Sequence, residues 1–214
     1  MGRTIREGEP VELTERDQRL FHWINGHGFV TVKQASAWMG ANYQAAQRRM
    51  RKLVDAGFLE RKRLLHGDKR VHWVTKQALA ASGDNLAPPQ TIGLGSYRHD
   101  LVLVDVAQAV VDHTGGDFVP ERRLRQQEGF KGVGVSGHLP DGLLRRPGQQ
   151  PIAVELEMST KGRRRLQQIV SGYAANMGLD QVWYFVTGQD VRHVVEEAAK
   201  PHDFIKVLDW RRLA

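Results

Sequence analysis

Ile152-Ala153-Val154-Glu155-Leu156-Glu157 is the stretch of sequence that decides the fold of the second half of this chain. It is apolar enough to predict a buried central strand, although it carries two carboxylates. Because successive side chains of a strand point to opposite faces, Glu155 and Glu157 are expected side by side on one face. Pro140-Asp141 precedes them on an expected neighbouring strand, from which Asp141 can join the pair. Three carboxylates at one strand edge are typical of a Mg²⁺ site, so Asp141, Glu155 and Glu157 are predicted as metal ligands and catalytic residues.

The segments around this strand predict a mixed α/β order. Hydrophobic periodicity favours helices at 97–113, 161–177 and 191–199, and strands at 118–125, 138–144, 152–157, 182–187 and 204–208. A glycine-rich loop at 132–137 spells G-x-G-x-x-G, but the extended segment that follows it is not the helix that a dinucleotide site needs. We therefore expect a flexible hairpin loop there.

The first half of the chain predicts three helices followed by a hairpin. Thr14 and Thr31 are helix-capping residues before two apolar-periodic segments, and a third helix is expected at about 43–56. Two strands, 58–65 and 70–74, a short helix at 75–82 and a linker rich in Pro and Gly at 83–96 follow. This order is typical of a winged helix-turn-helix, so we expect a DNA-binding domain at 1–82, a linker at 83–96 and an α/β domain at 97–214.

The third helix and the hairpin carry the residues that we expect at DNA. In a winged helix the third helix enters the major groove and the hairpin reaches the adjacent backbone. The candidates for reading base edges are Gln44, Gln47, Arg48 and Arg51. The candidates for contacting phosphates are Arg49, Lys52, Arg61, Arg63, Lys69 and Arg70. The alternative is a winged helix used for protein contacts, because a fold does not determine its ligand.

The distribution of charge agrees with a polyanion partner for the first half. The chain has a formal net charge of +7 and a sequence pI near 9.9. Residues 1–85 hold 15 Lys and Arg against 9 Asp and Glu, whereas residues 86–214 hold 16 against 15. Within 41–76 there are ten basic residues and three acidic ones, a local excess that favours nucleic acid, with a solvated charged face as the alternative.

Several classes of protein are disfavoured by composition. The chain contains no Cys, which excludes a disulfide framework and a thiolate zinc site. Its first twelve residues lack the apolar core of a signal peptide, and no uncharged run approaches the ~20 residues that span a bilayer. We therefore expect a soluble cytoplasmic protein without a membrane partner.

Two resemblances follow from these motifs. Pro140-Asp141 with Glu155-Leu156-Glu157 is similar to the E-x-E form of the metal-binding signature of the PD-(D/E)xK nuclease superfamily. The resemblance implies Mg²⁺ held by Asp141, Glu155 and the carbonyl of Leu156. Glu157 stands where the superfamily normally has Lys, which leaves Lys161 and the arginines at 163–165 as substitutes for that cation. The superfamily helix that can add an acid carries His99 and Asp100 here, and His138 is expected to hydrogen-bond near Asp141.

The whole arrangement, a winged helix joined to such a domain, resembles the replication-relaxation family of bacterial plasmids and integrative elements. The implied function is a double-stranded DNA-binding protein of a mobile element, acting in plasmid replication, transfer or their control, with a nuclease-like domain. Because Glu157 replaces the usual Lys, we expect this domain to be a scaffold without cleavage activity. One alternative is a Mg²⁺-dependent endonuclease or nickase, and another is a protein-binding adaptor. The expected partners are duplex DNA, a second copy of the chain in a homodimer, and a replication or relaxase protein.

Overall fold

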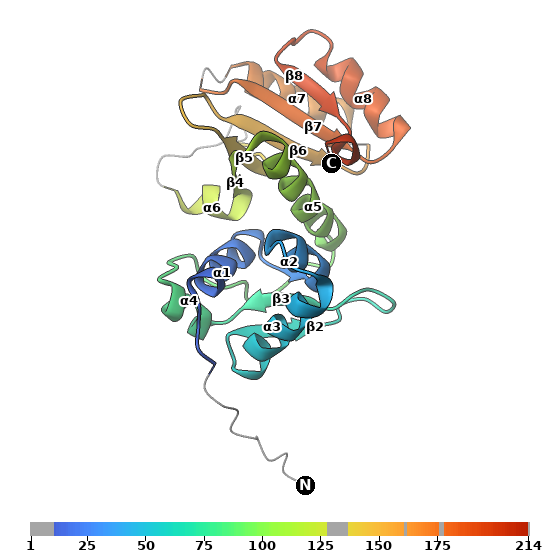
Figure 1. The fold of residues 1–214 in the computed structure, drawn as a ribbon. Coiled ribbons are helices and arrows are strands. Elements are labelled where there is room, and N and C mark those ends of the chain that lie inside the picture. The colour runs from blue at the N-terminus through green and yellow to red at the C-terminus, as the bar shows by residue number, and fades with distance from the viewer. Residues whose placement is uncertain (1–10, 128–136, 161, 176–177, 214) are drawn as a thin grey trace. The chain divides into compact units, whose positions relative to one another are not determined.

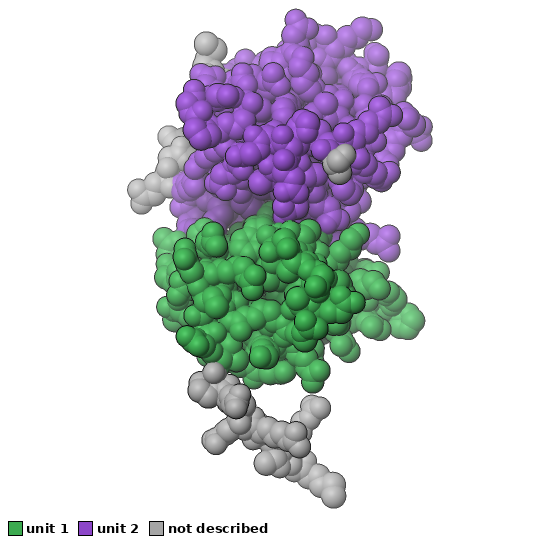
Figure 2. Space-filling model, viewed as in Figure 1, with its two compact units in different colours: residues 1–97 green, residues 98–214 purple. Residues whose placement is uncertain are grey.

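Two β-sheets organise the computed structural model, which describes residues 11–127, 137–160, 162–175 and 178–213. The expected glycine-rich loop, except Gly137, and Lys161 lie outside these described residues. The chain divides into two compact units, Met1–Tyr97 and Arg98–Ala214 (Figure 2). Each unit contains one sheet, so the fold is mixed α/β in both halves. No helix in the described part of the chain is long and apolar enough to span a bilayer.

The first unit combines short helices with a three-stranded antiparallel sheet of order β1-β3-β2 (Figure 1). Its elements are α1 (Glu15–His27), β1 (Val30–Thr31), α2 (Val32–Trp38), α3 (Tyr43–Asp55), β2 (Leu59–Lys62), β3 (Val71–Val74) and α4 (Lys76–Ser82). The three helices, the hairpin and the closing helix are confirmed. The two-residue strand β1 was not predicted, because a strand of that length leaves no periodic pattern in a sequence.

Local capping explains where these helices begin. The Thr14 side chain accepts from the backbone of Asp17, whose carboxylate accepts in return from the Thr14 backbone, which forms a capping box at the start of α1. Thr31 and Gln34 form the same arrangement at α2. The α3 helix ends before Gly57, whose φ of 82° is strained for residues with a side chain and lets the backbone turn directly into β2.

The second unit is built on a five-stranded mixed sheet of order β4-β5-β6-β7-β8. Its elements are α5 (Tyr97–Thr114), β4 (Asp117–Pro120), α6 (Glu121–Gln126), β5 (Gly142–Arg145), β6 (Ile152–Glu157), α7 (Arg163–Ala174), β7 (Gln181–Val186), α8 (Gln189–Ala199), β8 (Ile205–Leu208) and the short 3₁₀-helix η1 (Trp210–Arg212). Strands β4, β5 and β6 pair antiparallel, and β6, β7 and β8 pair parallel. All six residues of β6 are buried, which confirms the central strand.

Helices cover both faces of this sheet (Figure 1). On one face α7 and α8 pack on a core that includes Leu143, Ala153 and Tyr184. On the other face α5 packs on Ile152, Val154 and neighbouring apolar residues. The alternation along β6 places Glu155 and Glu157 on the α7 and α8 face, within the strand that both layers bury.

Two predicted strands begin or end elsewhere in the structure. The segment expected as a strand at 118–125 is β4 followed by the one-and-a-half-turn helix α6, because Pro120 ends the ladder and the Glu121 N–H donates to Asp141 O at 2.9 Å. The strand expected from residue 138 begins at Gly142. A Cβ at Gly142 would lie 2.2 Å from Phe118 Cζ, so only glycine lets β5 approach that ring.

Candidate nucleic-acid interface and carboxylate cluster

The α3 helix of the first unit has a polar face and a buried face. Ala46, Met50 and Leu53 are buried at helical spacing and hold the helix on the unit. The rest of the helix surface exposes the predicted base-edge candidates Gln44, Gln47, Arg48 and Arg51 and the predicted phosphate contact Lys52. Arg51 is in a solvent-exposed pair with Asp55 at 3.6 Å, an interaction that water screens strongly. The exposed residues can therefore contact a polyanion while Ala46, Met50 and Leu53 keep the helix packed on the unit.

Arg49 has a different role from the expected phosphate contact. Its Nε donates to Asp17 Oδ1 at 2.8 Å, its Nη2 donates to Asp17 Oδ2, and Nη2 also reaches Glu12 O at 3.0 Å. The Asp17 side chain is 1% exposed. Although burial raises the pKa of Asp17, the hydrogen bonds from Arg49 and Thr14 leave it below its usual value. Arg49 therefore joins α3 to α1, and it is not a residue of the proposed DNA interface.

The hairpin adds a second basic surface to the first unit. Its exposed cationic residues are Arg61, Lys62, Arg63, Lys69 and Arg70. Arg61 pairs in register with His72 on β3, which is buried. Burial, with a smaller effect of the nearby charges of Arg61 and Arg70, lowers the pKa of His72 to about 4, so this imidazole is neutral at pH 7. Among the described residues none of these five hairpin cations forms a salt bridge, so their charge is available to a ligand.

Tyr43 is a surface residue that the sequence reasoning missed. It is 46% exposed and stands at the first position of α3, directly after the capping residue Asn42. A large aromatic side chain at the start of an exposed helix can pack against sugar or base edges. Its position in the sequence could have indicated this exposure, because Tyr43 directly follows the capping residue Asn42 and does not belong to the series Ala46, Met50 and Leu53 that faces the core.

In the second unit, Asp141 lies at the strand edge as predicted. It precedes Gly142, which pairs with Val154, so Asp141 is beside Glu155 across the β5–β6 ladder. Its Oδ2 accepts from the Leu156 backbone N–H at 2.7 Å. The carboxylate therefore stabilises the end of the central strand.

His99 of α5 brings a cation to the same point. Its Nε2 lies 3.1 Å from Leu156 O and 3.3 Å from Asp141 Oδ2, and its Nδ1 lies 3.3 Å from Asp100 Oδ1. Burial lowers the pKa of His99, but the hydrogen bonds to Asp100 and Asp141 outweigh it and raise that pKa to about 10. An imidazolium thus lies between Asp141 and the Leu156 carbonyl, two of the three ligands that the nuclease resemblance implies.

Glu155 is directed into the protein. It is 2% exposed, and its Oε1 lies 2.6 Å from His138 Nε2 and accepts a hydrogen bond from the Tyr173 hydroxyl on α7. Burial raises the pKa of Glu155, although the His138 contact opposes that shift. The expected contact of His138 is thus made with Glu155. The hydrogen bond from Tyr173 was not predicted, because a tyrosine at a buried position of a helix is usually assigned to the hydrophobic core.

Glu157 is the third carboxylate of the cluster. It is 5% exposed, and its Oε1 accepts from the Ser159 backbone N–H at 3.4 Å. The neighbouring Tyr184 on β7 is 1% exposed, and burial together with Glu155 and Glu157 raises the pKa of its phenol. Burial and negative charge around it keep this phenol protonated at any physiological pH.

These donors do not fit a divalent ion as they are arranged. In the described part of the chain no three His, Asp or Glu side chains are grouped so that they could hold one metal. Asp141 is engaged by Leu156 and His99, whereas Glu155 is engaged by His138 and Tyr173. The assignment of Asp141, Glu155 and Glu157 to Mg²⁺ stays a prediction.

Comparisons of the chain with protein-family models, with curated proteins and with solved structures return no match.

Proposed function

We propose that the chain binds double-stranded DNA through a winged helix formed by its first unit. The observation that supports this best is the exposed surface of α3, where Arg48 lies on the side opposite the buried Met50 and the exposed Gln47 lies next to it. Gln and Arg are the side chains whose paired donors and acceptors match adenine and guanine edges in the major groove. The α3 helix is followed directly by the basic hairpin, the position that a wing needs to reach the adjacent backbone.

We propose further that the second unit is a nuclease-like scaffold that does not cleave DNA. His99 supplies a positive charge beside Asp141, at the place where the resemblance implies Mg²⁺. The carboxylate of Glu155 is enclosed by protein donors. From the resemblance to the replication-relaxation family we propose a bacterial mobile element as the setting, in plasmid replication, transfer or their control, with a cytoplasmic homodimer as the acting form.

Fluorescence anisotropy with labelled duplex DNA tests the interface. A mixed-sequence duplex measures general affinity, and a duplex selected from a random library by the wild-type protein measures site preference. We expect log affinity to fall linearly with log salt, with a slope of about 0.9 per phosphate contact. Gln47→Ala and Arg48→Ala should weaken binding to the selected duplex by about tenfold each, or about 1.4 kcal/mol, which lies within the about 1–3 kcal/mol of a base-reading contact.

Arg19→Ala is the matched control, because it removes the same charge from an exposed position of α1. It should leave site preference unchanged. If Gln47→Ala and Arg48→Ala behave like this control on the selected duplex, the assignment of α3 is wrong.

Incubation of supercoiled plasmid with the protein and Mg²⁺ or Mn²⁺ tests the second part of the proposal. No nicking is expected. Nicking that disappears in Asp141→Ala and Glu155→Ala would contradict the non-cleaving scaffold and support the nuclease alternative.

A further inference from the structure

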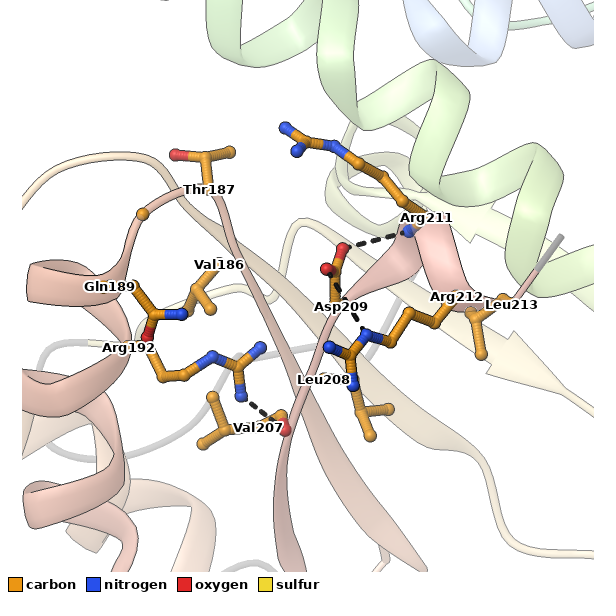
Figure 3. A pocket seen from close by; sticks show the side chains of 11 residues that line it. Val186, Thr187, Gln189, Arg192, Val207, Leu208, Asp209, Arg211, Arg212 and Leu213 are labelled. Carbon is orange, nitrogen blue, oxygen red and sulfur yellow. Dashed lines mark hydrogen bonds and ion pairs between the residues drawn. The ribbon is translucent and has the colours of Figure 1, made fainter.

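A cavity of about 590 Å³ opens at the carboxyl ends of β7 and β8 in the second unit (Figure 3). Its volume lies within the roughly 300–1,000 Å³ of typical small-molecule sites. The charged residues of its lining are Arg192, Arg211, Arg212 and Asp209. None of these residues belongs to the carboxylate cluster or to the DNA-binding candidates, so the cavity is a separate feature of the molecule.

The three arginines approach the cavity from two sides, as Figure 3 shows. Arg192 extends from α8, and its Nη1 donates to Val207 O at 3.3 Å and to Glu196 Oε1 at 3.2 Å. These contacts hold the guanidinium at the β8 side of the cavity while its side chain stays 25% exposed. Arg211 and Arg212 extend from η1, on the opposite side.

Positive charge dominates this lining. Among the described residues that line the cavity, Asp209 is the one acidic residue. Its Oδ1 accepts a hydrogen bond from the Arg211 backbone N–H at 3.1 Å, and its Oδ2 lies 4.0 Å from Arg212 Nε. Residues 86–214 as a whole contain 16 basic and 15 acidic side chains, so three arginines in the lining of one cavity are a local concentration, of which Arg212 is 87% exposed and Arg192 is paired with Glu196. Guanidinium groups bind phosphate oxygens in a paired, planar geometry that a lysine cannot reproduce.

The start of α8 contributes to the same side of the cavity. Gly188 and Gln189 line it, and the capping position Gly188 provides no side-chain acceptor for the first-turn N–H groups. The positive end of the helix dipole adds to the charge of the arginines, and Asp190 in the same first turn offsets part of it. Apolar lining residues, Val186, Val207 and Leu213 among them, provide a wall suited to the uncharged part of a ligand.

We propose that this cavity binds a phosphate group carried by a ligand of nucleotide size. Phosphate would contact the arginines, and sugar or base would pack on the apolar wall. The same chemistry is presented by a free mononucleotide and by a nucleotide within a nucleic-acid strand. The proposal does not depend on the interface of the first unit.

Isothermal titration of the full chain with four probes tests the proposal and identifies the source. The probes are inorganic phosphate, AMP, adenosine and a short single-stranded oligonucleotide. AMP should bind at least about tenfold more tightly than adenosine, since hydrogen bonds between charged groups are the strong ones. A preference for AMP over the oligonucleotide assigns a free nucleotide. Oligonucleotide binding that is tighter than AMP and lost with the cavity arginines assigns a nucleic-acid strand.

Two variants and a control complete the experiment. Arg192→Gln should weaken AMP binding about tenfold, and the more exposed Arg211→Gln about threefold. In the described part of the chain the Arg211 side chain makes no hydrogen bond and only lies over the Trp210 ring, 5.8 Å from its centroid, so Arg211→Gln remains informative if Arg192→Gln unfolds the unit. Arg125→Gln is the matched control. It breaks a pair with Glu121 on α6, outside the cavity, and this pair has the same i,i+4 spacing as the Arg192–Glu196 pair.

Two results would overturn the proposal. One is adenosine binding as tightly as AMP, and the other is Arg211→Gln and folded Arg192→Gln binding AMP as the control does. Neither result affects duplex binding by α3, so failure here and failure of the proposed DNA interface are distinguishable.

Discussion

The adjacent arginines Arg48 and Arg49 of α3 should have different effects when each is replaced by alanine: one on DNA affinity and the other on stability. Arg49 donates to the carboxylate of Asp17, which is 1% exposed, whereas Arg48 is exposed and forms no salt bridge with another described residue. Removing one partner of a buried ion pair costs about 3–5 kcal/mol, because the other charge is left in the interior. The Arg49 side chain is 20% exposed, so water reaches the pair and the lower end, about 3 kcal/mol, applies. Arg48→Ala should change the free energy of unfolding by less than about 0.5 kcal/mol.

Thermal unfolding followed by circular dichroism measures this difference. For a unit of this size about 3 kcal/mol lowers Tm by more than about 10 °C in Arg49→Ala. Hydrogen exchange should locate the loss of protection in α1 and α3, the two helices that the pair joins. At a temperature where both variants are folded, Arg48→Ala should lose DNA affinity and Arg49→Ala should retain more of it.

The pH dependence of the same pair has a defined sign. The pKa of Asp17 in the folded chain lies below its ordinary value of 3.8. Its contribution to stability is therefore present above that value and is lost as the pH falls through the folded pKa. The Tm difference between wild type and Arg49→Ala should narrow from pH 4 downward. Equal Tm values for Arg48→Ala and Arg49→Ala at pH 7, or a difference that persists in acid, would refute the role given to this pair.

Two further substitutions test the second unit. Gly142→Ala would place a Cβ 2.2 Å from Phe118 Cζ, so we expect a loss of about 2 kcal/mol in urea unfolding, whereas Gly95→Ala, with no atom within 4 Å, should change little. Comparable losses in both variants would contradict the packing argument. Burial raises the pKa of Glu155, so wild-type stability should fall as the pH rises above the ordinary value of 4.5. The Glu155→Gln variant has no carboxyl group at this position, so its Tm should not fall in this way. If the Tm curves of wild type and Glu155→Gln run parallel from pH 4 to 8, the pKa of Glu155 is not raised.

The elements that could be predicted are those whose signals are local. Thr14 and Thr31 mark helix starts because a capping hydroxyl and its partner are three residues apart in sequence. The strand 152–157 was predicted with its observed bounds, since six buried residues leave a continuous apolar pattern. By contrast, β1 is formed only when β3 is beside it, and the six residues of α6 are too few for helical periodicity to separate them from the strand before them.

The sequence by itself determined the order of most elements, the position of the basic excess and the side-by-side placement of Glu155 and Glu157, because each depends on neighbours along the chain. Tertiary structure decided what those side chains contact. His99 reaches Asp141 from a helix some forty residues earlier, and Arg49 turns from an expected DNA ligand into the partner of Asp17. Hydrogen bonds and desolvation act over a few ångströms in space, and a linear pattern does not record which distant groups share that space.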